Sequence, residues 1–274
     1  MFRSMRDLKS VTLEAIRRNG REIAWTAPWM NLGNYLMLGL WAHKSAGRKV
    51  LRHPGHDLLD LFPLFSERYL LAESRVRFMD QRVMPWSGGG SREIDWSQLS
   101  VFVREQLLPG SPLHDGGSGR QGQLVVNVRR GDYYSVEQNR QTFGINIPAY
   151  VSTAVATAMD DGWLPSSILV VSDDPGWCRE NLHGILGATA PVSYRPPKDP
   201  IGDLQALIHA ERLIIPNSTF SMWGGYIGDE LHPGRQVYAP WIFARGINGG
   251  EGQEYKPEWT IIRDIPGGWG LISE

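Results

Sequence analysis

Short apolar runs alternate with helix-like segments over the second half of the chain. A short apolar run bounded by polar or turn residues predicts a buried strand. The runs expected to form strands cover residues 123–129, 167–172, 191–194, 212–216 and 236–239. The helices expected between them begin near Pro148, at Pro175, at residue 203 (ending near 211) and at Ser218. Because strands that alternate with helices form a parallel sheet through right-handed crossovers, we expect a Rossmann-like lobe of the α/β class.

The first half shows a weaker form of the same pattern. Residues 22–26 and 48–51 predict strands, and the turn at 27–34 leads into a helix that extends to about Ala46. A Pro-, Gly- and Ser-rich stretch at 109–122 is typical of a linker between lobes. The parts expected are a basic amphipathic helix (1–20), an amino-terminal lobe (21–115), a carboxyl-terminal lobe (116–245) and a tail that packs back across the lobes (246–274).

Residues 1–20 place apolar side chains at helical spacing among basic ones. Ser4 is positioned to cap this helix and Gly20 to end it. Its apolar face consists of Leu8, Val11, Ala15 and Ile16. Such a helix either docks against the protein's own body or binds an anionic membrane surface. The chain has no apolar signal core and no apolar stretch of about 20 residues, so we expect a cytoplasmic protein, either free or peripheral at the inner face of the membrane.

The composition mainly excludes kinds of binding site and of covalent cross-link. The formal net charge is −1, which gives no reason to expect nucleic-acid binding. Cys178 is the single cysteine, so no intrachain disulfide forms, and its helix-like surroundings predict a packing role. His53 and His56 lie close together, but without a third ligand nearby they predict no metal site.

Polar residues follow three of the predicted strands directly. These are Arg129 and Arg130, then Ser172, Asp173 and Asp174, then Asn217, Ser218 and Thr219. They are expected to gather, because ligands of parallel α/β sheets bind beyond the carboxyl ends of the strands. Two guanidiniums suit phosphate oxygens, which arginine binds bidentately. The alternative is a surface arginine pair that forms a salt bridge with Asp132.

Three motifs occur in the order and with the approximate spacing of a known family. They are NVRRGDY (127–133), SDDPGWC (172–178) and NSTFSMW (217–223). On these motifs the chain resembles the inverting α1,2-fucosyltransferases, which are related to the α1,6- and protein O-fucosyltransferases. The regions 237–240 and 257–259 are also similar to the family's closing region, and residues 31–34 partly match its amino-terminal Gly-Leu-Gly-Asn-Gln segment.

The resemblance implies a GT-B-like fold, in which two Rossmann-like lobes with parallel sheets enclose a substrate cleft. It implies transfer of L-fucose from GDP-β-L-fucose to a hydroxyl of an oligosaccharide or glycolipid acceptor, with inversion and an α1,2 linkage. The donor would bind the carboxyl-terminal lobe, and the amino-terminal lobe would help to shape the acceptor site. Fixed arginines would stabilise the leaving diphosphate, so neither a metal nor a cofactor besides the donor substrate is expected.

The resemblance also assigns roles to residues. Arg129 would hold the β-phosphate with Arg130 as its helper, and Asp132 would orient the arginines, contact the donor or form a structural salt bridge. The catalytic residues expected are Arg129 and Asp132. The residues expected to bind the donor are Gly33, Asn34, Asn127, Arg129, Arg130, Ser172, Asp173, Asp174, Asn217, Ser218, Thr219, Phe220 and Ser221. For some of these a helix cap is the alternative role, namely for Asp173, Asp174, Asn217 and Ser218.

The sequence departs from the family pattern at three positions. Asn127 stands where the family has histidine, Tyr35 replaces a glutamine, and Met222 replaces the first tryptophan of Phe-Ser-Trp-Trp. Asparagine can form a hydrogen bond but cannot act as a base near neutral pH, so Asp132 and Asp115 are the remaining base candidates. These departures keep two alternatives open, a relative that binds nucleotide or glycan without turnover and a transferase that uses another GDP-sugar.

Overall fold

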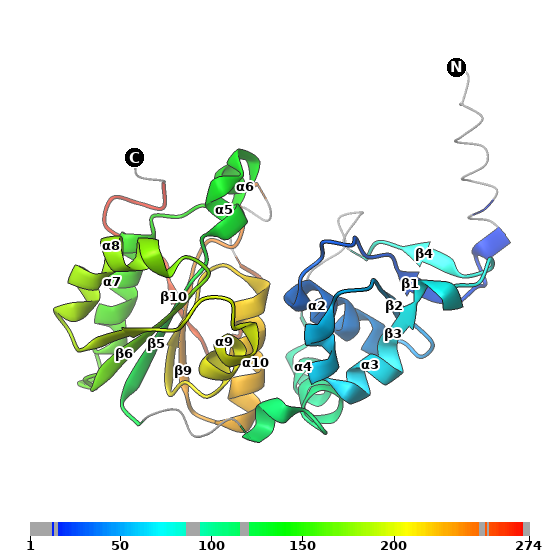
Figure 1. Cartoon of the computed structure of the whole chain (residues 1–274), viewed down its shortest axis with the longest axis horizontal. Helices are drawn as coiled ribbons and strands as arrows, with labels where there is room; N and C mark the ends of the chain where they lie inside the picture. Colours follow the sequence, from blue (N-terminus) through cyan, green and yellow to red (C-terminus); the bar gives the residue numbers. More distant parts are fainter. Residues whose placement is uncertain are drawn as a thin grey trace, which may run out of the picture. The chain divides into compact units, whose positions relative to one another are not determined.

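The computed structural model describes residues 13, 16–85, 94–115, 121–246, 250 and 252–270. The chain forms two compact units, Met1–Ser111 and Pro112–Glu274, and the division falls inside the Pro-, Gly- and Ser-rich stretch (Figure 1). Most of the predicted helix at 1–20 and the side chain of Asp115 lie outside the described residues. Each unit contains a parallel sheet, which confirms the predicted α/β class.

The sheet of the first unit has four short strands in the order β3-β2-β1-β4, and every pair is parallel. The strands are β1 (Glu22–Ala24), β2 (Lys49–Arg52), β3 (Leu70–Ala72) and β4 (Gln81–Val83). The α-helices are α2 (Leu32–His43), α3 (Pro63–Tyr69) and α4 (Trp96–Phe102). Shorter helical turns cover Asp57–Leu61, Glu73–Arg75 and Val103–Leu107.

The sheet of the second unit has the order β10-β9-β8-β5-β6-β7, again with every pair parallel. The strands are β5 (Gln123–Val128), β6 (Ser167–Ser172), β7 (Val192–Tyr194), β8 (Arg212–Ile214), β9 (Gln236–Pro240) and β10 (Thr260–Ile262). Read from the β7 edge and counted within the unit, this is the order 3-2-1-4-5-6 of a Rossmann fold. The predicted Rossmann-like topology is therefore present in the second unit.

Helices cover both faces of this sheet. Helices α7 (Ile147–Ala158) and α8 (Pro175–Gly187) lie on one face, and α9 (Pro200–Ile208) and α10 (Thr219–Leu231) lie on the other (Figure 1). The short helical turn Pro112–Asp115 opens the unit, and α5 (Gly131–Ser135) and α6 (Glu137–Phe143) follow β5. A sheet covered on both faces needs strands that are apolar on both sides, and β5 is buried at each position from Leu124 to Val128.

Three short strands and two short helices escaped the sequence analysis. Strands β3, β4 and β10 have three residues each, which is too few for a period of two to be recognised. Strand β10 comes from the segment 246–274 and extends the sheet beside β9. Helices α5 and α6 begin within the arginine motif, at Gly131, and end at Phe143, in a segment that shows no clear helical periodicity.

Candidate functional site

The site begins where the strand order of the second sheet reverses. Strands β5 and β8 are neighbours, but the chain leaves β5 toward α7 on one face and leaves β8 toward α10 on the other. The loops therefore diverge at the carboxyl ends of the two strands, the place where open α/β sheets bind their ligands, and we call this place the crevice. Arg129 follows β5 directly and Asn217 follows β8, so two of the three predicted motifs meet at this point.

Arg129 is held between two carboxylates. Its Nη1 donates to Asp173 Oδ2 at 2.8 Å, and its Nη2 donates to Asp132 Oδ1. The three side chains keep 35%, 28% and 50% of their surface exposed, respectively. Exposed ion pairs contribute little to stability, so the main effect of the two carboxylates is to orient the guanidinium. The predicted alternative, a salt bridge between Asp132 and the arginine pair, is confirmed for Arg129.

Asp173 also fixes the backbone of the arginine motif. Its Oδ1 accepts a hydrogen bond of 2.8 Å from the backbone N–H of Arg130. Gly131 lies against the same carboxylate, with a φ of +20°, and a Cβ at this position would come within 2.5 Å of Asp173 Oδ2. Since real Cβ atoms do not approach this closely, a side chain at position 131 would force the Asp173 carboxylate or the backbone to shift. The sequence analysis quoted Gly131 in the motif but gave it no role.

Arg130 is enclosed between two aromatic rings. Its guanidinium carbon lies 4.4 Å from the ring centroid of Tyr134 and 4.1 Å from that of Trp177. The side chain is 14% exposed, and its Nε lies 3.7 Å from Asp174 Oδ2. Guanidinium groups stack favourably on aromatic faces. Trp177 packs at the edge of the core, and its ring also forms one wall of the Arg130 site.

The second motif caps helix α8. Asp174 accepts a hydrogen bond of 3.1 Å from the backbone N–H of Trp177, and its own N–H donates to Ser172 Oγ at 3.0 Å. The capping role predicted as an alternative for Asp174 is thus confirmed, whereas Asp173 points to the arginines. Cys178 is fully buried, and burial raises the pKa of its thiol to about 11. This confirms its packing role.

Asn127 uses both ends of its amide inside the protein. Its Nδ2 donates to Val171 O at 2.8 Å, and its Oδ1 accepts from the hydroxyl of Ser221. Asn127 is 8% exposed and Ser221 is 1% exposed. The pair therefore links β5, β6 and α10 beneath the crevice, and a direct contact of either residue with the donor stays a prediction.

The third motif turns the chain from β8 into α10. Asn217 is 2% exposed, and its Nδ2 donates to Phe143 O at 2.9 Å and to Phe243 O at 2.8 Å. Ser218 is the N-cap residue in extended conformation, but no side-chain hydrogen bond caps the helix. The alternative that Ser218 caps α10 through its side chain is therefore wrong, and a capping role for Asn217 stays a prediction. Thr219 and Phe220 form the first turn of α10, beside the crevice.

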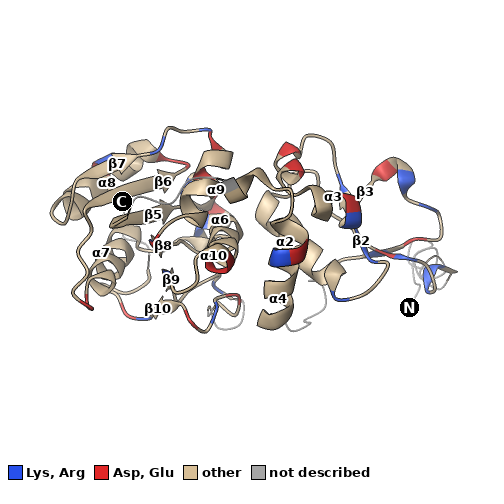
Figure 2. Cartoon of the chain, turned by 90° about the horizontal axis from the view of Figure 1, so that it is seen from below, with Lys and Arg blue, Asp and Glu red and all other residues tan. Residues whose placement is uncertain are grey.

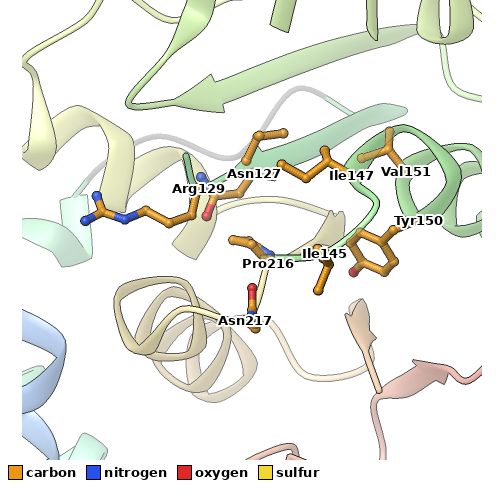
Figure 3. A pocket seen from close by; sticks show the side chains of 9 residues that line it. Asn127, Arg129, Ile145, Ile147, Tyr150, Val151, Pro216 and Asn217 are labelled. Carbon is orange, nitrogen blue, oxygen red and sulfur yellow. The ribbon is translucent and has the colours of Figure 1, made fainter. Parts of the chain in front are cut away.

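A small pocket lies directly below these loops (Figure 3). It is lined by Asn127, Val128, Arg129, Ile145, Ile147, Tyr150, Val151, Pro216 and Asn217. Its volume of about 10 Å³ is room for one water molecule. Figure 3 shows the Arg129 side chain extending away from this pocket, so the guanidinium is directed outward while apolar side chains close the floor.

Two tyrosines stabilise the loops and were missed by the sequence analysis as site residues. The ring of Tyr133 stacks on Phe143 with centroids 4.6 Å apart, and its hydroxyl donates to Asn217 O at 3.3 Å. Burial raises the pKa of Tyr133 to about 12, so this hydroxyl stays protonated. Tyr150 donates from inside the pocket to Ile215 O at 2.6 Å. Tyr133 could have been found because it ends the NVRRGDY motif.

The remaining predicted donor residues belong to the first unit. Gly33 and Asn34 lie in the first turn of α2, where the backbone N–H of Asn34 donates to the capping side chain of Asn31 at 3.1 Å. Gly33 is buried. Among the described residues, no group of three or more His, Cys, Asp or Glu side chains is arranged to hold a metal. Within the same residues, no helix is long and apolar enough to cross a membrane.

The two units differ in net charge: residues 1–111 carry 16 Lys and Arg against 11 Asp and Glu, whereas residues 112–274 carry 12 against 18. Basic and acidic segments are interspersed along the two units in Figure 2, in agreement with the formal net charge of −1. At the crevice itself, Arg129 and Arg130 lie among Asp132, Asp173 and Asp174. The site is therefore built from charge pairs with defined geometry rather than from an excess of positive charge.

Two known transferases are similar in sequence to parts of this chain. The galactoside alpha-(1,2)-fucosyltransferase 1 of Ateles belzebuth is 29% identical over 124 residues, which are 44% of this chain and 34% of the relative. The alpha-1,2-colitosyltransferase of Escherichia coli is 26% identical over 104 residues, 38% of this chain and 36% of the relative. The chain thus spans about a third of the length of these relatives. A crystal structure of POFUT1 in complex with GDP superposes with a TM-score of 0.41 at 14% identity, covering 86% of this chain and 79% of that chain.

The family model gives the assignment. The model of "Glycosyl transferase family 11" matches residues 111–263, which include all of the strands and helices that form the crevice. This match extends over more than half of the 274 residues. The chain therefore belongs to glycosyl transferase family 11.

Proposed function

We propose that this chain transfers L-fucose from GDP-β-L-fucose to a hydroxyl of a glycan acceptor, with inversion and an α1,2 linkage. The observation that carries the proposal is the pair of oriented arginines at the point where the strand order reverses, in a chain of family 11. Relatives of the chain are named alpha-(1,2)-fucosyltransferases, which supports both the sugar and the linkage.

The chemistry follows from the leaving group. The acceptor oxygen forms a bond to the anomeric carbon of fucose while the bond from that carbon to the β-phosphate oxygen breaks. The electron pair of the broken bond passes to GDP, and the proton of the acceptor hydroxyl leaves to a base or to solvent. Negative charge on the diphosphate increases as the bond breaks, so a fixed cation stabilises the transition state more than the ground state.

Arg129 is our candidate for this cation. Its guanidinium is oriented by Asp132 and Asp173 and remains about one-third exposed. Arg130 adds a second positive charge, held in place by its two aromatic neighbours. Two guanidiniums supply positive charge at the diphosphate, so we propose that the reaction requires no metal.

The first experiment is a thermal-shift panel with GDP, GDP-fucose, GDP-mannose, UDP and UDP-glucose. A ligand at 100 times its Kd adds about 2.7 kcal/mol of stability. We expect stabilisation of the wild type by GDP and GDP-fucose alone, and a loss of that stabilisation in Arg129→Ala. The control is Arg179→Ala, which removes an arginine that contacts Tyr194 on the outside of α8. If no guanine nucleotide stabilises the wild type, the chain has no donor site and the proposal fails.

Turnover then tests the step itself. Arg129→Ala should lower kcat/KM by a factor of about 100 to 1,000, the range for losing one donor that stabilises a developing oxyanion. Arg129→Lys should recover only part of the rate, because an ammonium cannot replace the planar fork. Activity should survive EDTA. A loss of activity in EDTA that Mg²⁺ or Mn²⁺ restores would contradict the metal-independent mechanism.

A second candidate is transfer of a different sugar from GDP. The relative from Escherichia coli is named an alpha-1,2-colitosyltransferase, so relatives of this chain differ in the sugar that they carry. Turnover with a GDP-sugar other than GDP-fucose, at a higher kcat/KM, would favour this candidate. Binding of GDP without turnover of any GDP-sugar would instead indicate a binding protein.

A further inference from the structure

An exposed tryptophan occupies the tip of a turn in the first unit. The turn runs from Ala27 to Met30 and is closed by a hydrogen bond of 3.0 Å from Met30 N to Ala27 O. Trp29 is 83% exposed, more than any other large apolar side chain among the described residues. Isolated apolar side chains are common on protein surfaces, so exposure by itself gives Trp29 no role.

The turn is held at both of its ends. Pro28 restricts the backbone dihedral before Trp29, and its carbonyl is bound by His56 Nε2 at 2.9 Å. Met30 anchors the other end with an exposure of 6%. A loop held in this way loses little conformational entropy when a ligand binds, which is how proteins preorganise a contact.

A second histidine fixes the base of the same loop. His53 Nε2 lies 2.9 Å from Thr26 O, and the ring of His56 packs on Tyr35 with centroids 4.9 Å apart. The loop after β1 is therefore tied to the loop after β2 at two points. These histidines, which the sequence analysis considered as metal ligands and set aside, act here as hydrogen-bonding supports.

The position in the sheet points to a ligand. The order β3-β2-β1-β4 reverses between β1 and β4, as the order of the second sheet reverses between β5 and β8. The turn that carries Trp29 follows the carboxyl end of β1. It therefore lies at the place in the first sheet where the rule for parallel α/β sheets predicts a binding crevice.

The loop after β2, which supports this turn through His56, also carries polar groups. Arg52 forms a bidentate pair with Asp60, at 2.7 and 3.0 Å, and its Nη2 also donates to His56 O at 3.3 Å. Asp60 is 61% exposed, and hydrogen bonding to Arg52 lowers the pKa of its carboxyl. A flat apolar ring and exposed, fixed hydrogen-bonding groups, in two loops that are joined by hydrogen bonds, match a sugar ring, which has an apolar C–H face and a rim of hydroxyls.

We propose that Trp29 stacks on a pyranose ring of the acceptor glycan and that this ring is a galactoside. The proposal rests on the proposed function, because the galactoside is taken from the substrate class that the names of the relatives give. Trp29 then determines the affinity for the acceptor, whereas Arg129 and Arg130 of the second unit hold the donor.

The test is ligand-observed NMR with lactose, a β-galactoside, on the full chain without any donor. We expect saturation transfer from the wild type to the galactose ring protons, a Kd raised at least about tenfold in Trp29→Ala, which corresponds to about 1.4 kcal/mol, and partial recovery in Trp29→Phe. The matched control is Phe78→Ala. Phe78 is a 63% exposed aromatic residue of the same unit that precedes β4, at the opposite edge of the sheet.

The outcomes separate this proposal from the proposed function. If wild type shows no transfer to lactose, or if Trp29→Ala and Phe78→Ala weaken lactose binding equally, the assignment of Trp29 is overturned even when GDP binds normally. If lactose binding depends on Trp29 but GDP-fucose is neither bound nor turned over, the proposed function fails while the sugar site stands. In an active enzyme, Trp29→Ala should raise the KM for lactose at least about tenfold, with a smaller change in kcat.

Discussion

Arg129 and Asp173 are 44 residues apart in the sequence, yet they form an ion pair of 2.8 Å at the ends of neighbouring parallel strands. The register of the sheet causes this contact. Val128, the last residue of β5, pairs with Ser172, the last residue of β6, so the next residue of each strand is brought to the same level. The same carboxylate holds the backbone of Arg130, and both arginines therefore depend on it.

Gly131→Ala should disrupt this arrangement. The added methyl would meet Asp173 Oδ2 at 2.5 Å and displace the carboxylate from Arg129. We expect a loss of about 1 kcal/mol or more in stability, because alanine disfavours a positive φ, together with a Kd for GDP raised by about tenfold or more. Isothermal titration calorimetry with GDP and urea unfolding measure the two effects.

The control for Gly131 is Gly162→Ala. Gly162 also has a positive φ, of +84°, but no atom lies within 4 Å of the position of its missing Cβ. It should lose stability and keep its affinity for GDP. Equal loss of GDP affinity in both variants would show that backbone strain, rather than the contact with Asp173, is responsible.

Trp177→Ala should weaken donor binding through Arg130. Removal of one ring frees a guanidinium that is held 4.1 Å from the Trp177 centroid. A stacking contact of about 0.5–2 kcal/mol corresponds to a rise of about 2- to 30-fold in the KM for GDP-fucose. Trp177→Phe should recover part of the affinity, which a purely structural role at the edge of the core would not require. Steady-state kinetics with separate kcat and KM values provide the measurement.

The control for Trp177 is Trp163→Ala. Trp163 lies 4.4 Å from the guanidinium of Arg212, a similar contact at the opposite edge of the sheet, where β8 begins. Its removal should lower stability and leave the KM for GDP-fucose unchanged. An unchanged KM in Trp177→Ala as well would exclude a positioning role for that ring.

The main expected effect of Asn127→Ala is a lower free energy of unfolding. The substitution leaves the buried Ser221 hydroxyl and the Val171 carbonyl without the amide. A buried polar group without its partner costs about 1–3 kcal/mol. Because Asn127 and Ser221 share one hydrogen bond, the double variant with Ser221→Ala should lose less than the sum of the single losses. If urea unfolding shows that the two single losses of stability add up strictly in the double variant, the hydrogen bond between Asn127 and Ser221 does not contribute as proposed.

Stability should fall in mildly acidic solution because of a histidine pair. His209 Nδ1 lies 2.9 Å from His232 Nε2, and His209 Nε2 lies 3.0 Å from Leu113 O. Two neutral rings satisfy this chain when His232 donates to His209 and His209 donates to the carbonyl, whereas protonation of both rings would set two N–H donors against each other. Burial lowers the pKa of both rings, and the neighbouring positive charge of Arg235 lowers both further.

The direction of the pH effect follows from proton counting. Below the unfolded pKa of about 6.5 the unfolded chain binds more protons than the folded one. The free energy of unfolding should therefore be constant above about pH 6.5 and decrease as the pH is lowered toward the folded-state pKa values. His43, whose pKa is also lowered by burial, acts in the same direction. Urea unfolding between about pH 8 and pH 5 should show a shallower slope in His209→Gln/His232→Gln.

The elements that the sequence predicted well have strong local signals. Strand β6 occupies the predicted residues 167–172, and α8 begins at the predicted Pro175. Both follow from a run of apolar residues or from a proline in the first turn. Helix α9 was placed at 203–211 but covers Pro200–Ile208. Asp199 caps this helix and Pro200 is its first residue, so the sequence does contain a start signal. The apolar pattern alone places the start three residues too late.

Taken alone, the sequence determined the class of fold and the edge of the sheet at which the polar motifs gather, and it identified the two arginines as candidates for anion binding. These follow from strand–helix alternation and from residue type, which are local properties. Only the tertiary structure decided which carboxylate orients Arg129 and which ring encloses Arg130. It also decided that the side-chain amides of Asn127 and Asn217 form hydrogen bonds inside the protein. Each of these contacts depends on strand register and on the packing of helices on the sheet. Both are set by the summed burial of residues far apart in the chain, which no single segment encodes.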